Sequence, residues 1–241
     1  MILHRLLWRF LWHRDDAEFY RLQATDAVRW LKASGVALGP GVSVLDLGCG
    51  HGVFGRALLA LGCRVTFADE HNQLLPECRL ARFEAINLDR DKLDGLGRFD
   101  LVVCSNVLEH LRHPETFLSQ AHVLLNPSGR FFLSWTNWLS PWGGHEFSPL
   151  HYLGSGFGPW LFGKMGKRHF HRPGINLFPT FVGRIMAHVA RSTRLRIIRC
   201  APRYYTELEW LMAVPGLREF LAWNCAMILE IRPVVDEGTR R

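Results

Sequence analysis

The fold is decided by the stretch Val44-Leu45-Asp46-Leu47-Gly48-Cys49-Gly50-His51-Gly52-Val53-Phe54. Apolar residues lead into an acid, glycines follow at alternate positions, and apolar side chains then continue at helical spacing as far as Leu61. This pattern predicts a buried strand over residues 42–47 that turns tightly into a helix over 53–61. Glycine in such a turn lets a bound molecule approach the backbone closely. The alternative is a strand–helix turn with incidental glycines.

Asp46 indicates which ligand the turn would bind. The string Gly50-x-Gly52-x-x-Gly55 satisfies the dinucleotide-binding pattern, which alone is a weak signal. Asp46 lies inside the end of the strand, two residues before the first glycine. A carboxylate there repels a pyrophosphate, whereas a ligand with a cationic amine and no phosphate tolerates it. We therefore favour a ligand of the second kind.

Four further segments follow in a regular order. A predicted strand over 64–68 ends at Asp69, and another over 83–88 ends at Asp89. A strand over 99–105 precedes the turn Asn106-Val107-Leu108-Glu109-His110. Residues 124–133 then form a helix–turn–strand segment, Leu-Leu-Asn-Pro-Ser-Gly-Arg-Phe-Phe-Leu. In this order and spacing, residues 42–135 resemble the class I S-adenosylmethionine-dependent methyltransferases, with Ser128 replacing the usual first glycine of the last motif.

The resemblance implies that S-adenosyl-L-methionine is the cofactor. It places Asp69 on the ribose hydroxyls, with Glu70 as the alternative one residue later. It places Asp89 at the adenine amino group, with Asp91 as the alternative. The predicted cofactor-binding residues are Asp46, Gly48, Cys49, Gly50, Gly52, Asp69, Glu70, Asp89 and Asn106.

The alternation of helices and strands predicts an α/β fold with helices on both faces of a mostly parallel sheet. A helix over 17–33 precedes the first strand, and strands over 195–200 and 226–231 flank a helix over 207–222. The resemblance implies a Rossmann-like, seven-stranded sheet in the order 3-2-1-4-5-7-6 with the last strand antiparallel. Ligands of open α/β sheets bind beyond the carboxyl ends of the strands.

Composition favours one domain in a reducing compartment. The chain has 241 residues, of which 48% are hydrophobic and 21% charged, typical of one globular domain over 1–241. We expect residues 1–40 to form a helical cap on it. The six cysteines include no C-x-x-C pair, which favours a cytoplasmic protein with free thiols. No apolar run reaches the roughly 18 residues that span a bilayer.

Residues 138–180 interrupt the alternation after the fifth strand. A connection of this length is typically functional or disordered, and its Trp, Tyr and Phe content argues against disorder. We expect an insertion that acts as a lid over the reacting methyl group. Its Gly-Gly-His-Glu (143–146) and His-Tyr-Leu-Gly (151–154) strings resemble a group of actinobacterial methyltransferases with unassigned acceptors.

The chemistry of methyl transfer sets what the catalytic residues must do. Holding donor and acceptor in line supplies most of the acceleration, and a base is needed only when the acceptor loses a proton. Each candidate has an alternative structural role as a hydrogen-bonding anchor. A metal site from His145, Glu146 and His151 matches no standard zinc spacing, so we predict no metal. The catalytic candidates are His110, His145, Glu146, His151 and Tyr152.

The N-terminal residues 1–14 predict a basic amphipathic helix. They contain no acid, their leucines fall on one helical face, and Trp8 and Trp12 flank them. This pattern is typical of an interfacial membrane helix, and the alternative is a helix packed on its own domain.

A second basic cluster over 164–172 and the net charge of +7 lack any recognisable nucleic-acid-binding module, so we expect no nucleic acid partner. The prediction is a cytoplasmic methyltransferase, peripheral at a membrane, for a small-molecule or lipid-like acceptor. The alternatives are an NAD(P)-dependent oxidoreductase on the same fold, disfavoured by Asp46, and a catalytically silent cofactor-binding subunit.

Overall fold

A computed structural model describes residues 2–13, 17–154, 156–166 and 170–233. One seven-stranded sheet crosses the molecule, and β7 runs antiparallel to both of its neighbours, which confirms the predicted order and direction. In spatial order the strands are β3 (Arg82–Ala85), β2 (Arg64–Asp69), β1 (Ser43–Leu47), β4 (Phe99–Ser105), β5 (Leu125–Thr136), β7 (Asn224–Ile231) and β6 (Leu195–Pro202).

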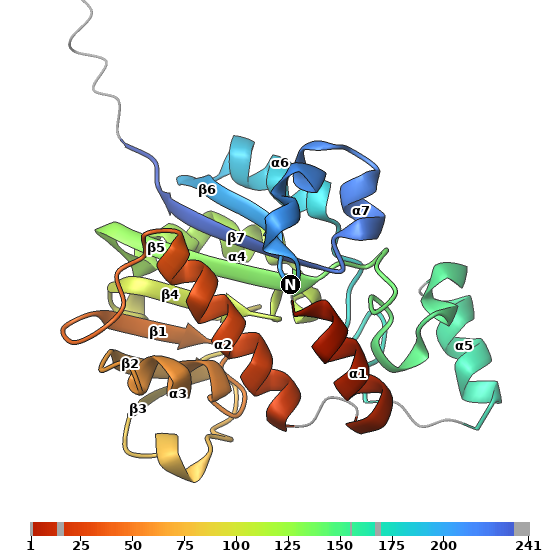
Figure 1. The fold of residues 1–241 in the computed structure, drawn as a ribbon, viewed down its shortest axis with the longest axis horizontal. Coiled ribbons are helices and arrows are strands. Elements are labelled where there is room, and N and C mark those ends of the chain that lie inside the picture. The colour runs from red at the N-terminus through yellow and green to blue at the C-terminus, as the bar shows by residue number, and fades with distance from the viewer. Residues whose placement is uncertain (1, 14–16, 155, 167–169, 234–241) are drawn as a thin grey trace, which may run out of the picture.

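Helices cover both faces of this sheet (Figure 1). Alternate strand side chains point to opposite faces, so Val44 joins a core with α2 (Ala17–Ala33) and α3 (Val53–Leu59). Leu45 and Leu47 join a second core with α4 (Pro114–Gln120) and α6 (Val182–Ser192). The two cores explain why the central strands are apolar on nearly every residue.

Several predicted boundaries were wrong. The helix predicted over 53–61 ends at Leu59, and residues 125–128, predicted to precede the fifth strand, belong to it. The third strand ends at Ala85, although Ile86 N still donates to Asp69 O at 2.9 Å, and residues 88–90 form a turn. The helix predicted over 114–124 is α4 followed by a 3-10 turn, Ala121–Leu124. The helix predicted over 207–222 is a 3-10 segment, Thr206–Ala213, and a short α7, Leu217–Leu221. Val214-Pro215-Gly216 separates them, because proline cannot continue the hydrogen-bond ladder and Gly216 has a φ of 84°.

The N-terminal helix α1 (Leu3–His13) has an inner and an outer side. Ile2 and Leu6 are buried in a small core with side chains of α2 and of the segment after β6. Leu11 and Trp12 are 75% and 73% exposed on the other side. Arg14, the last residue of the predicted basic helix, lies outside the described residues.

The insertion leaves the sheet where β5 ends and has a core of its own. It contains the 3-10 turns His145–Phe147 and Leu150–Leu153 and the helix α5 (Phe157–Lys164). Trp138, Phe147, Phe162 and Leu177 form its buried cluster. The base is closed because Trp138 N donates to Thr180 O at 3.0 Å. Residues 167–169 of the predicted basic cluster lie outside the described residues. Within the described chain, we find no helix that combines the length and apolarity needed to cross a membrane.

Candidate active site

The glycine turn joins β1 to α3 and has positive φ angles at Gly48, Gly50 and Gly52. A Cβ at Gly48 would lie 2.5 Å from Val107, and one at Gly52 would lie 2.7 Å from Leu74. These two glycines are therefore required by packing inside the protein. A Cβ at Gly50 would have nothing within 4 Å, so this glycine borders open space. Gly50 is the position where a ligand can approach the backbone.

Backbone hydrogen bonds fix the turn to the neighbouring strand. Gly48 N and Cys49 N both donate to Ala68 O in β2, at 2.8 and 3.2 Å. Gly52 N donates to Cys49 O at 2.8 Å, which closes the loop. Burial raises the pKa of the Cys49 thiol well above its ordinary value, so this side chain is neutral. We therefore expect Cys49 to contribute to cofactor binding through its backbone and the size of its side chain, without a thiolate charge.

Asp46 is buried under the turn. Its Oδ2 accepts a hydrogen bond from Gly55 N at 2.8 Å. Burial raises the pKa of Asp46 from 3.8 to about 7, against the lowering effect of the Gly55 bond, and the charge of Asp69 raises it further. A Cβ at Gly55 would lie 2.2 Å from Phe67 and 2.8 Å from the Asp46 carboxylate. The last glycine of the dinucleotide-like string is therefore explained by packing against a carboxylate, not by a phosphate.

Asp69 ends β2 and faces the glycine turn. Its Oδ2 accepts from Gly50 N at 2.8 Å, and its Oδ1 accepts from Glu70 N at 2.7 Å. Glu70 instead accepts a hydrogen bond from Asn87 Nδ2 at 3.1 Å. Of the two acids considered for the ribose, Asp69 is the one joined to the open position of the turn.

The acids after β3 hold loops together. Asp89 accepts hydrogen bonds from Arg112 N at 2.9 Å and from His113 N at 3.2 Å, at the start of α4. Asp91 accepts from Asn87 N at 2.8 Å. Asp89 thus ties the segment after β3 to the segment after β4. Its contact with adenine stays a prediction.

Asn106 is the centre of a buried polar network that the sequence analysis missed. Its backbone is left-handed, with a φ of 57°. Its Oδ1 accepts from Arg203 Nη1 at 2.9 Å and from Asn224 Nδ2 at 2.8 Å, while its Nδ2 donates to Gln23 Oε1 at 3.1 Å. Arg203 also donates to Ser134 Oγ at 2.9 Å. The network joins the ends of β4, β6 and β7 to α2, so Asn106 fixes the shape of this edge.

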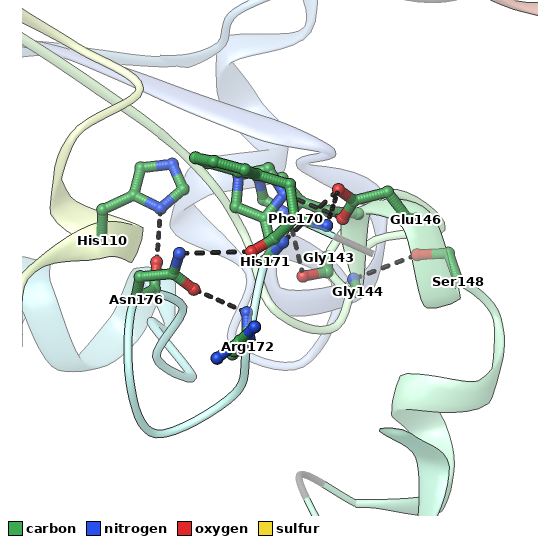
Figure 2. Close-up of polar contacts among 10 residues, drawn as sticks. His110, Gly143, Gly144, Glu146, Ser148, Phe170, His171, Arg172 and Asn176 are labelled. Carbon is green, nitrogen blue, oxygen red and sulfur yellow. Dashed lines mark hydrogen bonds and ion pairs between the residues drawn. The ribbon is translucent and has the colours of Figure 1, made fainter. Parts of the chain in front are cut away.

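Three histidines meet where the turn after β4 faces the insertion, namely His110, His145 and His171; Figure 2 labels His110 and His171. The ring centroids of His145 and His171 are 4.3 Å apart, and those of His110 and His171 are 5.2 Å apart. Burial, with the neighbouring His171 and His110, lowers the pKa of His145 from 6.5 to about 3. His145 is therefore a neutral imidazole near pH 7. The only signal for His171 in the sequence is its place in the basic cluster over 164–172, which does not predict its contact with two other histidines.

The remaining candidates anchor the insertion. Glu146 accepts from Phe170 N at 3.1 Å and contacts His171 Nδ1 at 2.8 Å. His151 is buried, and its Nε2 lies 3.1 Å from the carbonyl oxygen of Ser140. The Tyr152 hydroxyl donates to a backbone carbonyl, Leu139 O, at 3.0 Å. These contacts fit the alternative role of each residue as a hydrogen-bonding anchor. Participation of the three residues in catalysis stays a prediction.

The structure thus regroups the predicted catalytic residues. Within the part of the chain that the structure describes, no group with metal-ligand geometry contains His151, so the set His145, Glu146 and His151 is not formed. The described residues contain one group with metal-ligand geometry, namely His110, His145 and His171, each with a ligand atom within 4.8 Å of the others.

Comparisons with known proteins identify the family. Residues 45–131 match the family described as "Methyltransferase domain". An uncharacterised methyltransferase of Mycolicibacterium vanbaalenii is 31% identical over 241 residues, covering 93% of this chain and 92% of the relative. The chain therefore belongs to the methyltransferases, and its sheet is that of the class I, S-adenosylmethionine-dependent branch.

Solved structures agree on the fold. An S-adenosylmethionine-dependent methyltransferase from Mesorhizobium loti superposes with a TM-score of 0.57 at 23% identity, covering 85% of this chain and 97% of that one. A magnesium protoporphyrin IX methyltransferase from Synechocystis, with bound S-adenosylhomocysteine, gives 0.53 at 18% identity, covering 89% and 84%. The predicted family and methyl donor are confirmed, and the oxidoreductase alternative finds no support.

Proposed function

We propose that this methyltransferase acts on an apolar, lipid-like acceptor that it takes from a membrane surface. The observation that carries the proposal is a set of exposed apolar side chains on two elements at the carboxyl edge of the sheet. Soluble proteins seldom expose clustered large apolar residues unless the surface contacts something.

The donor half of the proposal rests on the glycine turn. The open space at Gly50 accommodates a ligand, and the neighbouring Asp69 carboxylate retains acceptor capacity for two ribose hydroxyls. A carboxylate under the turn suits the cationic methionine end of S-adenosylmethionine. When bound, this cofactor supplies an electrophilic methyl group. The chain then has to hold the acceptor in line and exclude water.

The first apolar element is α1. Leu11 and Trp12 are exposed on a helix whose opposite side, at Leu6, is fully buried. Arg5 lies on the same helix, which has no acid in its first turn. Attachment through such a helix combines apolar insertion with attraction to anionic lipid. Packing on the domain and contact with a membrane therefore use different sides of α1.

The second apolar element is the insertion. Phe157 and Trp160 of α5 are exposed, their rings stack at 5.4 Å, and Lys164 Nζ lies 5.8 Å from the Trp160 ring. Phe170 is 77% exposed. Aromatic side chains next to a lysine are typical of the interface between lipid headgroups and acyl chains.

Both elements lie at the edge where methyl transfer would occur. The insertion begins where β5 ends, and α1 packs on Tyr204 and Tyr205, which follow the end of β6. Trp142 of the insertion contacts Phe19 of α2, which belongs to the small core under α1; the ring centroids are 6.2 Å apart. In Figure 1, α1 and α5 lie on the same side of the molecule. A membrane that touched both would face the acceptor entrance.

Flotation with anionic liposomes tests the proposal. We expect the wild-type protein to float at low salt and less at high salt, since surface electrostatics are screened. The double variant Leu11→Ala/Trp12→Ala should bind at least about tenfold more weakly, because each lost apolar side chain contributes about 1.5–3 kcal/mol when inserted.

The matched control is Leu80→Ala/Ile198→Ala, which removes two exposed apolar side chains outside α1 and the insertion. It should float like the wild type. The same liposomes, incubated with S-adenosylmethionine carrying a labelled methyl group, should take up label into the lipid fraction. A wild-type protein that does not float, or an equal loss in the control, would contradict membrane contact.

A further inference from the structure

We propose that His110, His145 and His171 bind a divalent transition-metal ion of the zinc type, with a fourth position open toward the acceptor. The metal-binding part is independent of the acceptor, whereas the role of the fourth position rests on the proposed function.

The three imidazoles come from separate parts of the chain and converge. His110 belongs to the turn after β4, His145 starts the first 3-10 turn of the insertion, and His171 lies in its returning segment. Their ligand atoms lie within 4.8 Å of one another. A tetrahedral zinc ion with Zn–N bonds of about 2.0–2.1 Å places ligand nitrogens about 3.3 Å apart. To bind an ion, each separation between two ligand nitrogens of the triad thus has to shorten by at most about 1.5 Å.

Each ring is oriented by a protein oxygen at its δ-nitrogen. His110 Nδ1 lies 2.8 Å from Asn176 O, His171 Nδ1 lies 2.8 Å from Glu146 Oε2, and His145 Nδ1 lies 3.5 Å from Gly143 O. Donation of the Nδ1 proton to these oxygens leaves each ε-nitrogen with a free lone pair. Metal-binding histidines typically have this second contact to a carboxylate or carbonyl, which fixes the tautomer and raises ligand basicity.

The backbone at His145 is a separate observation that favours a site. Its φ of 51° is left-handed, a conformation that costs free energy outside glycine and that gathers at functional positions. Glu146, the next residue, holds the returning segment through Phe170 N and His171 N, at 3.1 and 3.4 Å. These contacts of Glu146 with Phe170 and His171 are drawn in Figure 2. They hold the two loops with the rings of His145 and His171 in contact before any ion binds.

Three imidazole ligands with a fourth open position form the ligand set of catalytic rather than structural zinc. Coordination of an acceptor hydroxyl at that position lowers its pKa, so its proton leaves to water before transfer. The acceptor oxygen then forms a bond to the methyl carbon. The carbon–sulfur bond of the donor breaks, and its electron pair remains on sulfur as a thioether.

The site is placed for this role. His110 follows Asn106 by four residues in the turn at the carboxyl end of β4. Phe178 N of the insertion donates to Glu109 O at 2.8 Å, which holds the insertion to that turn. The metal would lie between the donor edge of the sheet and the segment expected to cover the acceptor.

Zinc titration of the metal-free, full-length protein without a polyhistidine tag tests the site. After EDTA treatment and dialysis, we expect one Zn²⁺ per chain by elemental analysis and a saturable isotherm. Co²⁺ should give the visible absorption bands of a four-coordinate ion. His145→Gln and His171→Gln should each weaken zinc affinity at least about 100-fold. Glu146→Gln should weaken it about 10- to 100-fold, because it removes the carboxylate that orients His171 and holds the returning segment, and leaves the three histidines in place.

The matched control is His113→Gln, an exposed histidine close to the triad in sequence but outside it. It should bind zinc like the wild type, and melting temperatures should show that all variants fold. Wild-type protein that takes up no zinc at micromolar concentration would overturn the proposal, as would triad variants that retain wild-type affinity. S-adenosylhomocysteine binding by the metal-free protein separates the two claims, since it persists if only the metal site is wrong.

Discussion

Gly50→Val is the perturbation that the structure predicts most sharply. Gly50 has a φ of 52°, and an added Cβ meets no atom within 4 Å. Gly35, just after α2, has the same two properties with a φ of 76°. A side chain in the left-handed region costs about 1–2 kcal/mol, which lowers the melting temperature of a domain of this size by about 2–8 °C. We expect Gly50→Val and Gly35→Val to lose similar stability.

Only the first variant should lose cofactor binding. Valine at position 50 fills the open space next to Asp69. Valine at position 35 lies in the turn after α2, outside the glycine turn. We expect Gly50→Val to weaken S-adenosylhomocysteine binding at least about 100-fold, or about 2.8 kcal/mol, in titration calorimetry. Gly35→Val should bind within about twofold of the wild type. Binding by Gly50→Val within threefold of the wild type would refute the assignment of the turn.

Three further changes test separate parts of the account. Asp69→Ala should weaken S-adenosylhomocysteine binding at least about tenfold, because charge-assisted hydrogen bonds contribute about 1.5–3 kcal/mol each. As a control, Asp94→Ala changes an exposed acid and should leave the affinity measured by calorimetry unchanged. The raised pKa of Asp46, about 7, means that the folded state binds a proton more tightly than the unfolded state, so stability falls as pH rises from about 4 to about 7. Asp46→Asn should therefore raise the melting temperature at pH 8 by about 2–4 °C or more and change it little at pH 4, and equal shifts at both pH values would contradict the burial argument. Leu6→Ala removes a fully buried side chain of α1 and should cost about 2–5 kcal/mol in urea denaturation, whereas the exposed Leu11→Ala should cost less than about 0.5 kcal/mol.

The sheet, and the grouping of the glycine turn with Asp46 and Asp69 at one of its edges, were predictable because their signals are local. The end of β1 contains Asp46 and is followed by Gly50, and β2 ends at Asp69. The order of the strands brings these ends to one edge of the sheet. The same reasoning failed for the end of the third strand, because the apolar Ile86 and Leu88 continue the pattern past Ala85, where the strand ends.

The histidine cluster and the polar network around Asn106 were not predictable from spacing. His171 joins His110 across a separation of 61 residues, and Arg203 reaches Asn106 across 97. Only the tertiary fold brings these groups together. Arg203 is buried and paired with amide and hydroxyl oxygens, whereas its sequence neighbourhood gives no sign that the guanidinium is inside. His171 lies in a basic segment whose charge conceals its proximity to two other imidazoles.

The central claim is that the glycine turn with Asp69 binds S-adenosylmethionine rather than a nicotinamide nucleotide. Titration calorimetry of the wild-type protein with S-adenosylhomocysteine and, separately, with NADH tests it directly. We expect saturable binding of S-adenosylhomocysteine with a dissociation constant in the micromolar range, which corresponds to a binding free energy of about −8 kcal/mol. We expect no heat of binding with NADH. Binding of NADH without binding of S-adenosylhomocysteine would contradict it.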